Sequence, residues 1–166
     1  MMTKKKAFEF LEKNQPFPED ESVEFNIKKF NEIRIFFIEN NDPLCVPLFL
    51  NCFGEGSGFG IYQTIEDLVA QYDDELVIMH LNKALFSQYA GVRYWCAQIA
   101  QNYKDTSLIN GLIYSYKLGG NDSKCASLIA LSNYDDLKVI DIANDSLKEE
   151  VDDGLLQEIA SDILKR

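Results

Sequence analysis

A corner motif that returns at a fixed spacing constrains the fold of this chain more than any other feature. Tyrosine-led acidic segments stand 31 residues apart, at Tyr72-Asp73-Asp74, Tyr103-Lys104-Asp105 and Tyr134-Asp135-Asp136. One period earlier lies Asn41-Asp42-Pro43. A fixed period of about 20 to 50 residues is typical of stacked supersecondary units. The spacing therefore predicts four copies of one structural unit.

Apolar residues recur within each copy in the pattern of a helical hairpin. After each corner they take positions i, i+1 and i+4 of a short helix: Val46-Pro47 with Leu50, Val77-Ile78 with Leu81, Leu108-Ile109 with Leu112, and Val139-Ile140 with Ala143. A second helical stripe closes each copy: Ile61, Ile65, Leu68 and Val69; Val92, Cys96, Ile99 and Ala100; Cys125, Leu128 and Leu131; and Leu155, Ile159 and Ile163. An aspartate at each corner can accept hydrogen bonds from free N–H groups at a helix start: Asp42, Asp74, Asp105 and Asp136. The unit is a helix, a tight acidic turn and a second helix.

The chain before the first corner predicts two more helices, around residues 3–13 and 22–40, the second opened by Ser22. Pro16 and Pro18 indicate a loop between them. The glycine-rich stretch 53–61 is expected to be a flexible loop between helices. No segment alternates apolar and polar residues as a strand does, and the count comes to about ten helices. We predict one domain, with N-terminal helices in 1–40 and repeats near 41–71, 72–102, 103–133 and 134–166.

Two stretches resemble the repeat signatures of HEAT-type proteins: Asn41 to Leu48 and Gly91 to Ala100. In that family an acidic corner leads into the inner helix, and a Val-Arg pair followed by small residues marks the outer one, as at Val92-Arg93. The third copy has Ser123-Lys124 in place of that pair, and the fourth lacks it. The resemblance covers residues 22–164 loosely. It implies an all-α fold, a right-handed α-solenoid of HEAT-like hairpins, and it carries no catalytic residue with it.

The charge of the chain restricts its partners. The net charge is -11, and residues 135–162 hold ten acidic residues against two lysines. A nucleic-acid reader needs positive charge to neutralise phosphates, so a likeness to HEAT-like DNA glycosylases is disfavoured. A basic protein would be attracted instead. The alternative for the acidic last repeat is a solvated terminal cap, because end repeats need a polar outer face.

The composition supplies little material for catalysis, metal binding or export. His80 is the only histidine, which leaves no histidine-based relay or metal site. Asp73-Asp74-Glu75 and Asp152-Asp153 are interpreted as helix caps, and the stretch Gly54 to Gly58 lacks the ending of a phosphate loop. Four cysteines are expected to be reduced core thiols: Cys45, Cys52, Cys96 and Cys125. We expect no cofactor, no metal, no membrane span, no cleaved signal and a cytoplasmic location.

A row of side chains along the first helices of the repeats is the candidate binding surface. Asn51, Asn82, Ile113 and Asn144 recur at one position of each copy, either as a ladder that satisfies backbone groups or as a binding strip. The predicted partner-binding residues are Asp73, Asp74, Glu75, His80, Asn82, Asp105, Asn110, Tyr114, Asp141, Asn144 and Asp145. Aromatic residues that suit a binding hot spot are Tyr94, Trp95, Tyr114 and Tyr116, although Trp95 could instead fill the core between repeats.

These features predict a protein-binding module, monomeric when free, whose acidic concave face holds another protein. A small acidic chain with degenerate repeats and no catalytic set resembles several immunity proteins of polymorphic or contact-dependent toxin systems. Its surface would mimic nucleic acid toward a basic nuclease or block an active site. The alternative is a general cytosolic scaffold or regulator, and gene context separates the two. An enzyme, the third class, would need a pocket lined by groups of perturbed pKa.

Overall fold

The chain folds into helices throughout the part that the computed structural model describes, residues 2–18, 20–148 and 154–166. These ranges hold ten α-helices and no strand, which confirms the predicted all-α class. The α-helices are α1 (Lys4–Lys13), α2 (Val23–Glu39), α3 (Cys45–Asn51), α4 (Ile65–Val69), α5 (Asp74–Ala84), α6 (Ala90–Ala100), α7 (Ile109–Leu118), α8 (Asn121–Leu131), α9 (Leu137–Lys148) and α10 (Gly154–Leu164). Three 3₁₀ turns accompany them: η1 (Gly58–Gly60), η2 (Tyr62–Thr64) and η3 (Thr106–Leu108).

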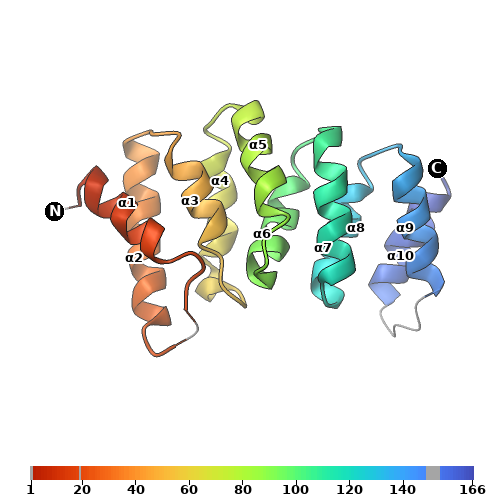
Figure 1. The fold of residues 1–166 in the computed structure, drawn as a ribbon, viewed down its shortest axis with the longest axis horizontal. Helices are drawn as coiled ribbons and strands as arrows, with labels where there is room; N and C mark the ends of the chain where they lie inside the picture. Colours follow the sequence, from red (N-terminus) through yellow and green to blue (C-terminus); the bar gives the residue numbers. More distant parts are fainter. Residues whose placement is uncertain (1, 19, 149–153) are drawn as a thin grey trace.

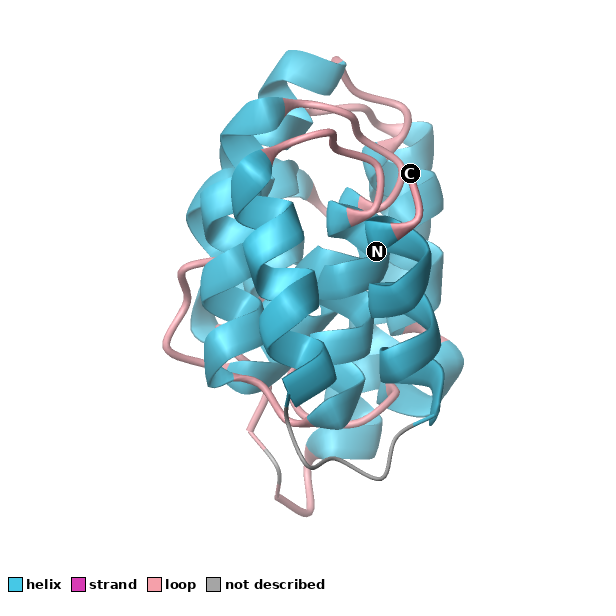
Figure 2. Cartoon of the chain, turned by 90° about the vertical axis from the view of Figure 1, so that its right-hand side faces the viewer, coloured by secondary structure: helices cyan, strands magenta, loops and turns pink. Residues whose placement is uncertain are grey.

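The helices lie side by side in two layers along the long axis of the molecule, with the termini at opposite ends (Figure 1). In one layer α1 contacts α3, α3 contacts α5, α5 contacts η3 at the start of α7, and α7 contacts α9. In the other, α2 contacts α4, α6 contacts α8, and α8 contacts α10. The view along the stack in Figure 2 shows both layers. The apolar core therefore runs between them along the whole length.

The predicted apolar columns form this core, with two corrections. The first and last members of each set are buried: Val46, Val77, Leu108 and Val139, and Leu50, Leu81, Leu112 and Ala143. The middle position is less regular, and Ile140 is 36% exposed because α9 ends its layer. In α10 the buried stripe is Leu156, Ala160 and Ile163, so the prediction that Leu155 is buried was wrong. A shift of one residue turns a side chain by about 100° around a helix.

The corner aspartates cap helix starts as predicted at two of the four corners, Asp105 before η3 and Asp136 before α9. Asp42 instead holds the turn before α3, whose N-cap residue is Leu44 and has no side-chain cap hydrogen bond. The carboxylates of Asp42, Asp105 and Asp136 each accept a hydrogen bond from the backbone N–H two residues later, at 3.1, 2.8 and 2.8 Å. At the second corner Asp73 accepts from Glu75 N–H at 2.9 Å, so the assignment of this role to Asp74 was wrong. The reason is the backbone: Asp73 is outside the helix at ψ 131°, whereas Asp74 is already its first residue.

The start of α2 also differs from the expectation in its cap. Ser22 directly precedes the helix, as predicted, but its side chain makes no cap hydrogen bond to the helix backbone. Its N–H and hydroxyl both donate to the carboxylate of Asp20. These hydrogen bonds lower the pKa of Asp20. The turn before α2 is therefore held by the aspartate rather than by the serine.

The corner tyrosines join neighbouring corners. The hydroxyl of Tyr134 donates to the backbone oxygen of Tyr103 at 3.1 Å. The hydroxyl of Tyr72 accepts the backbone N–H of Asp42 at 3.3 Å and lies 3.2 Å from the Cys45 thiol. All three tyrosines are buried. Each of these two bonds ties a corner to the one before it in the chain.

The glycine-rich connection between α3 and α4 is packed against α6, although the sequence predicts a flexible loop. A Cβ at Gly91 would lie 2.0 Å from the backbone oxygen of Gly54, so two backbones meet there with no room for a side chain. Gly54 N–H donates to the hydroxyl of Tyr62 at 3.0 Å, and the indole N–H of Trp95 donates to Gly56 at 3.0 Å. These contacts fix the loop on the second layer of helices.

Candidate functional site

The predicted binding residues divide between the corners and the exposed sides of the helices. Asp73, Asp74 and Glu75 lie where α5 begins, and Asp105 directly precedes η3. The carboxylates of Asp73 and Asp105 are occupied by backbone N–H groups, and hydrogen bonds from Ser107 lower the pKa of Asp105. These two residues therefore have a structural role at the corners, which leaves Asp74 and Glu75 as the exposed charges of that edge.

The remaining charged and polar candidates gather on one side of α7 and α9. Asn110 and Tyr114 are four residues apart on α7, as Asp141 and Asp145 are on α9, and all four are exposed. This spacing places each pair on one side of its helix. The ammonium group of Lys138 donates to the side-chain oxygen of Asn110 at 3.0 Å and so bridges the two helices. The structure thus brings these candidates onto one continuous face.

The asparagine row serves the backbone at two of its positions. Asn51 donates to the backbone oxygen of Pro47 at 2.8 Å, and Asn144 donates to that of Ile140 at 3.0 Å. Both bonds reach back four residues within the same helix, which is a common use of a polar side chain there. Asn82 and Ile113 are half-buried. The row is thus at least in part a structural ladder, the first of the two interpretations.

His80 is half-buried on α5, and burial followed by the charge of Lys83 lowers its pKa. Its imidazole is therefore mainly neutral at pH 7, because the ordinary value already lies near 6.5. A neutral ring can both donate and accept a hydrogen bond. His80 thus presents a polar but uncharged group beside the exposed face.

Exposed apolar side chains on the same face were missed from the sequence. Phe86, two residues after the end of α5, is 47% exposed, and its ring centroid lies 5.1 Å from that of Tyr114, which is 36% exposed. Met79 and Leu118 are exposed as well. The sequence could have indicated these residues, because they are apolar and lie outside the repeating core columns. We define the α5–α7–α9 face by Met79, Phe86, Asn110, Tyr114, Leu118, Asp141 and Asp145.

The charge of this face is mixed in the part of the chain that the structure describes. Lys83, Lys117 and Lys138 are exposed on the same three helices as Asp141 and Asp145. Four acids of the predicted acidic last repeat lie outside the described residues: Glu149, Glu150, Asp152 and Asp153. The cap interpretation of Asp152-Asp153 falls outside them too. The described face combines apolar, acidic and basic side chains.

The strongly perturbed groups are buried and structural. All four cysteines are thiols outside disulfide bonds, and all four are buried, as predicted. Burial raises the pKa of Cys45 to about 11 and that of Tyr103 to about 12, and raises those of Cys52 and Cys96 as well. A thiol of high pKa is a poor nucleophile at neutral pH, since the thiolate is the reactive form. Across residues 2–18, 20–148 and 154–166, no three His, Cys, Asp or Glu side chains gather in a way that could hold a metal ion.

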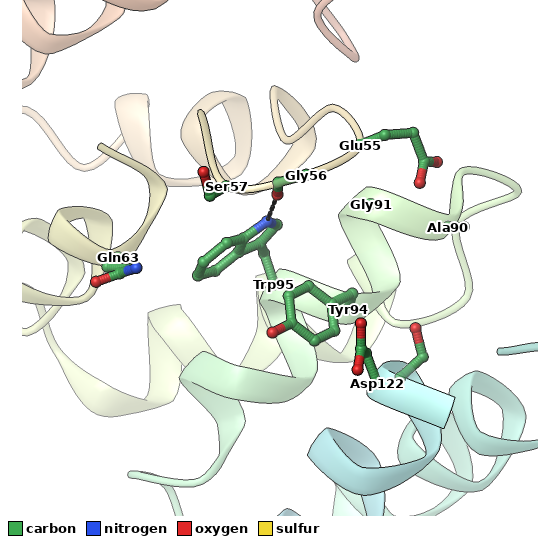
Figure 3. A pocket seen from close by; sticks show the side chains of 10 residues that line it. Glu55, Gly56, Ser57, Gln63, Ala90, Gly91, Tyr94, Trp95 and Asp122 are labelled. Atoms are coloured by element: carbon green, nitrogen blue, oxygen red, sulfur yellow. Dashed lines mark hydrogen bonds between the residues drawn. The ribbon is translucent and has the colours of Figure 1, made fainter. Parts of the chain in front are cut away.

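A pocket of about 300 Å³ lies on the other layer of helices, beside the glycine-rich loop (Figure 3). Trp95 and Tyr94 of α6 form its aromatic wall, with Gln63 on one side. Glu55 of the loop and Asp122, in the first turn of α8, also line it. A neighbouring hollow of about 340 Å³ shares Gln63, Tyr94 and Trp95. We call the first of these the loop pocket.

The loop pocket combines residues that were singled out from the sequence with others that were not. Tyr94 and Trp95 were candidate hot-spot residues. Trp95 is also buried against the ring of Phe53, with centroids 6.0 Å apart, so the alternative that it fills the core holds as well. Glu55 and Asp122 gave no signal, because only the packing of the loop against α6 and α8 brings them together.

No protein-family model matches this chain, and no curated protein matches it at a significant level. The part of the chain that the structure describes contains no helix with the length and apolar character needed to cross a membrane. The function must therefore be argued from the surfaces themselves.

Proposed function

We propose that this chain is a protein-binding module built as a right-handed, HEAT-like α-solenoid with a 31-residue period. The hydrogen bond between the Tyr134 hydroxyl and Tyr103, 31 residues apart, supports the repeat because it joins equivalent corners. Contacts between most of the successive helices within each layer support the stacked architecture. In such a fold each repeat packs against its neighbours and leaves extended faces for a partner.

The observation that carries the proposed function is the exposed aromatic pair on the α5–α7–α9 face. Phe86 and Tyr114 are in contact with each other yet remain open to solvent. Exposed apolar side chains that gather in one place commonly indicate an interaction surface. Tyrosine is also enriched in binding hot spots. Lysine and aspartate side chains around the pair supply the polar rim that a protein interface needs.

The partner that this protein suits best is a basic protein. The net charge of -11 attracts a positively charged protein from a distance and accelerates its association at low salt. The most concrete version of the proposal is an immunity protein that binds and neutralises a cognate toxin in the cytoplasm of a bacterium. A toxin that acts on nucleic acid carries the positive surface that such a field would capture.

The proposal is tested with the gene product encoded directly upstream of this chain. We expect a basic toxin domain there and binding to it in isothermal titration calorimetry. Replacing both aromatic residues, Phe86→Ala with Tyr114→Ala, should weaken binding at least about tenfold, which is roughly 1.4 kcal/mol. The matched control is Phe25→Ala on α2, another exposed phenylalanine outside this face, which should leave affinity unchanged.

Two outcomes would count against the proposal. Unchanged affinity of the double variant would show that the interface lies outside the α5–α7–α9 face. Absence of a basic toxin, together with specific binding to a housekeeping protein, would replace the immunity function with that of a general scaffold or regulator. Repeating the titration at high salt separates the electrostatic part of the affinity from the apolar part.

A further inference from the structure

We propose that the loop pocket receives an arginine side chain of a protein partner. The pocket lies on the layer that contains α6 and α8, whereas the α5–α7–α9 face belongs to the other layer (Figure 1). It is thus a second contact site. The inference does not depend on whether the partner is a toxin, because any basic protein could present the side chain.

The shape of the pocket suits a long side chain. Its volume of about 300 Å³ is at the small end of the roughly 300–1,000 Å³ range of ligand sites. Ala90 and Gly91 border it at the start of α6, so no large side chain fills the space above the helix. Close contact between Gly91 and Gly54 fixes the position of the loop that forms the opposite wall. The cavity therefore follows from the packing of backbone.

The aromatic wall is held in place before any ligand arrives. The hydroxyl of Tyr94 accepts a hydrogen bond from the Gln98 amide at 3.1 Å, and Gln98 in turn accepts one from Gln101 at 2.9 Å. The ring of Tyr94 also meets that of Trp95 at a centroid distance of 5.1 Å, in an edge-on arrangement. Trp95 is anchored by its own bond to the loop at Gly56. A preorganised site loses less entropy on binding.

The charge of the pocket favours a cation. The described residues that line it include the two carboxylates of Glu55 and Asp122 and no lysine, arginine or histidine. In Figure 3 the carboxylate of Asp122 is drawn beside Tyr94, and Glu55 extends from the loop above the start of α6. The position of Asp122 in the first turn of α8 also favours that helix, so its charge has two uses.

Arginine fits this arrangement better than lysine. The flat guanidinium group stacks on aromatic rings and presents several N–H donors in a plane, so it can pair with a carboxylate while it covers a ring. Its aliphatic stem suits the walls that Ala90 and Trp95 provide. The amide oxygen of Gln63 supplies one more acceptor.

The test uses Trp95, the single tryptophan of the chain, as a reporter. Because its indole N–H bonds to Gly56 in the pocket wall, its resonance in a ¹H–¹⁵N spectrum is sensitive to occupation of the site. The probe is a blocked Gly-Arg-Gly peptide, and the control is the same peptide with citrulline, a neutral isostere of arginine. We expect a saturable shift with a Kd on the order of 1 mM for the arginine peptide and no saturable shift for citrulline.

Variants of the protein locate the effect. The pair Glu55→Gln with Asp122→Asn should raise the Kd of the arginine peptide at least fivefold. The control pair Glu39→Gln with Asp162→Asn removes the same charge from α2 and α10 and should change it less than twofold. Replacing Phe86 and Tyr114 should leave it unchanged, which separates this result from that of the proposed function.

Four results would overturn the inference, and the first three are equal shifts with arginine and citrulline, no shift with either peptide, and equal weakening by both charge-removing pairs. Tighter binding of free L-arginine than of the blocked peptide would also overturn it, because the pocket would then recognise a free amino acid. A saturable shift confined to the arginine peptide, and lost in the Glu55 and Asp122 pair, supports it.

Discussion

Replacing Gly91 by alanine tests the contact on which the loop pocket depends. The added methyl group would lie 2.0 Å from the backbone oxygen of Gly54 and 2.5 Å from its carbon. An ordinary contact begins near 3.4 Å, so the loop must move away from α6 by at least about 1.4 Å. Neither atom belongs to a side chain that could rotate aside. The clash must therefore be relieved by moving backbone.

The size of the effect follows from what that movement disturbs. Overpacking of a tightly packed site costs about 1–3 kcal/mol. Two hydrogen bonds hold the loop, from Gly54 N–H to Tyr62 and from the Trp95 indole to Gly56, and each contributes about 1 kcal/mol. Alanine offsets up to about 1 kcal/mol of this through its higher helix propensity. We expect Gly91→Ala to lower the free energy of unfolding by about 3 kcal/mol.

Urea unfolding followed by circular dichroism measures this change, and tryptophan fluorescence reports the loop contact itself through Trp95. The melting temperature should fall by about 6–12 °C for a chain of this length. Gly154→Ala is the matched control, because no atom of the described residues lies within 4 Å of a Cβ at that position, and it should change stability by less than about 0.5 kcal/mol. Wild-type stability of Gly91→Ala would show that the loop does not rest on α6.

Two further changes test the corners. Tyr134→Phe should lower the free energy of unfolding by about 1 kcal/mol, because the buried backbone oxygen of Tyr103 loses its hydrogen-bond donor. The control Tyr114→Phe, on the surface, should have almost no effect on the urea midpoint. Equal effects of the two changes would contradict the corner bond. Lys4 lies 3.0 Å from Asp42 and holds the pKa of that carboxyl below its ordinary value of 3.8. The stabilisation from this ion pair is therefore present above the pKa that Asp42 has in the unfolded chain. It is lost as the pH falls through the lower pKa that Asp42 has in the folded protein. Lys4→Met should thus be less stable than wild type at about pH 6 but equal to it well below pH 3.8, and a difference that persists in acid would refute this role.

The corners were largely predictable because their chemistry is local. Asp42, Asp105 and Asp136 bond to N–H groups only two residues away, and such short-range pairing is visible in sequence. The choice between Asp73 and Asp74 as the capping residue could not be predicted, because either carboxylate could cap a helix. Only the backbone angles decide which of the two precedes the helix. The recurrence of tyrosine was visible without its reason. At two of the three positions the reason is a bond to the preceding corner, made by Tyr134 and by Tyr72.

The loop pocket could not be predicted from the sequence because it arises from the packing of the glycine-rich loop against α6 and α8. The sequence predicts a loop over residues 53–61 but does not show that this loop packs against α6. The apolar stripe from Ile61 also predicted an earlier helix start, whereas α4 begins only at Ile65, after two 3₁₀ turns. Positive φ angles at Gly58, Phe59 and Gly60 bend the chain away from helical geometry there. The prediction that Leu155 rather than Leu156 is buried was wrong because neighbouring helices decide which side of α10 is covered.

The tyrosine links at the corners would also contribute to the response of the molecule to tension. The corners that precede α3, α5, α7 and α9 follow one another along the long axis, so a force that separates the two termini acts on them in series (Figure 1). Each link joins only adjacent corners, as those of Tyr134 and Tyr72 do. Tyr72 links the first corner to the second, and Tyr134 links the third to the fourth. A pull on the two ends of the molecule would therefore load two separate pairs of corners rather than one unbroken row.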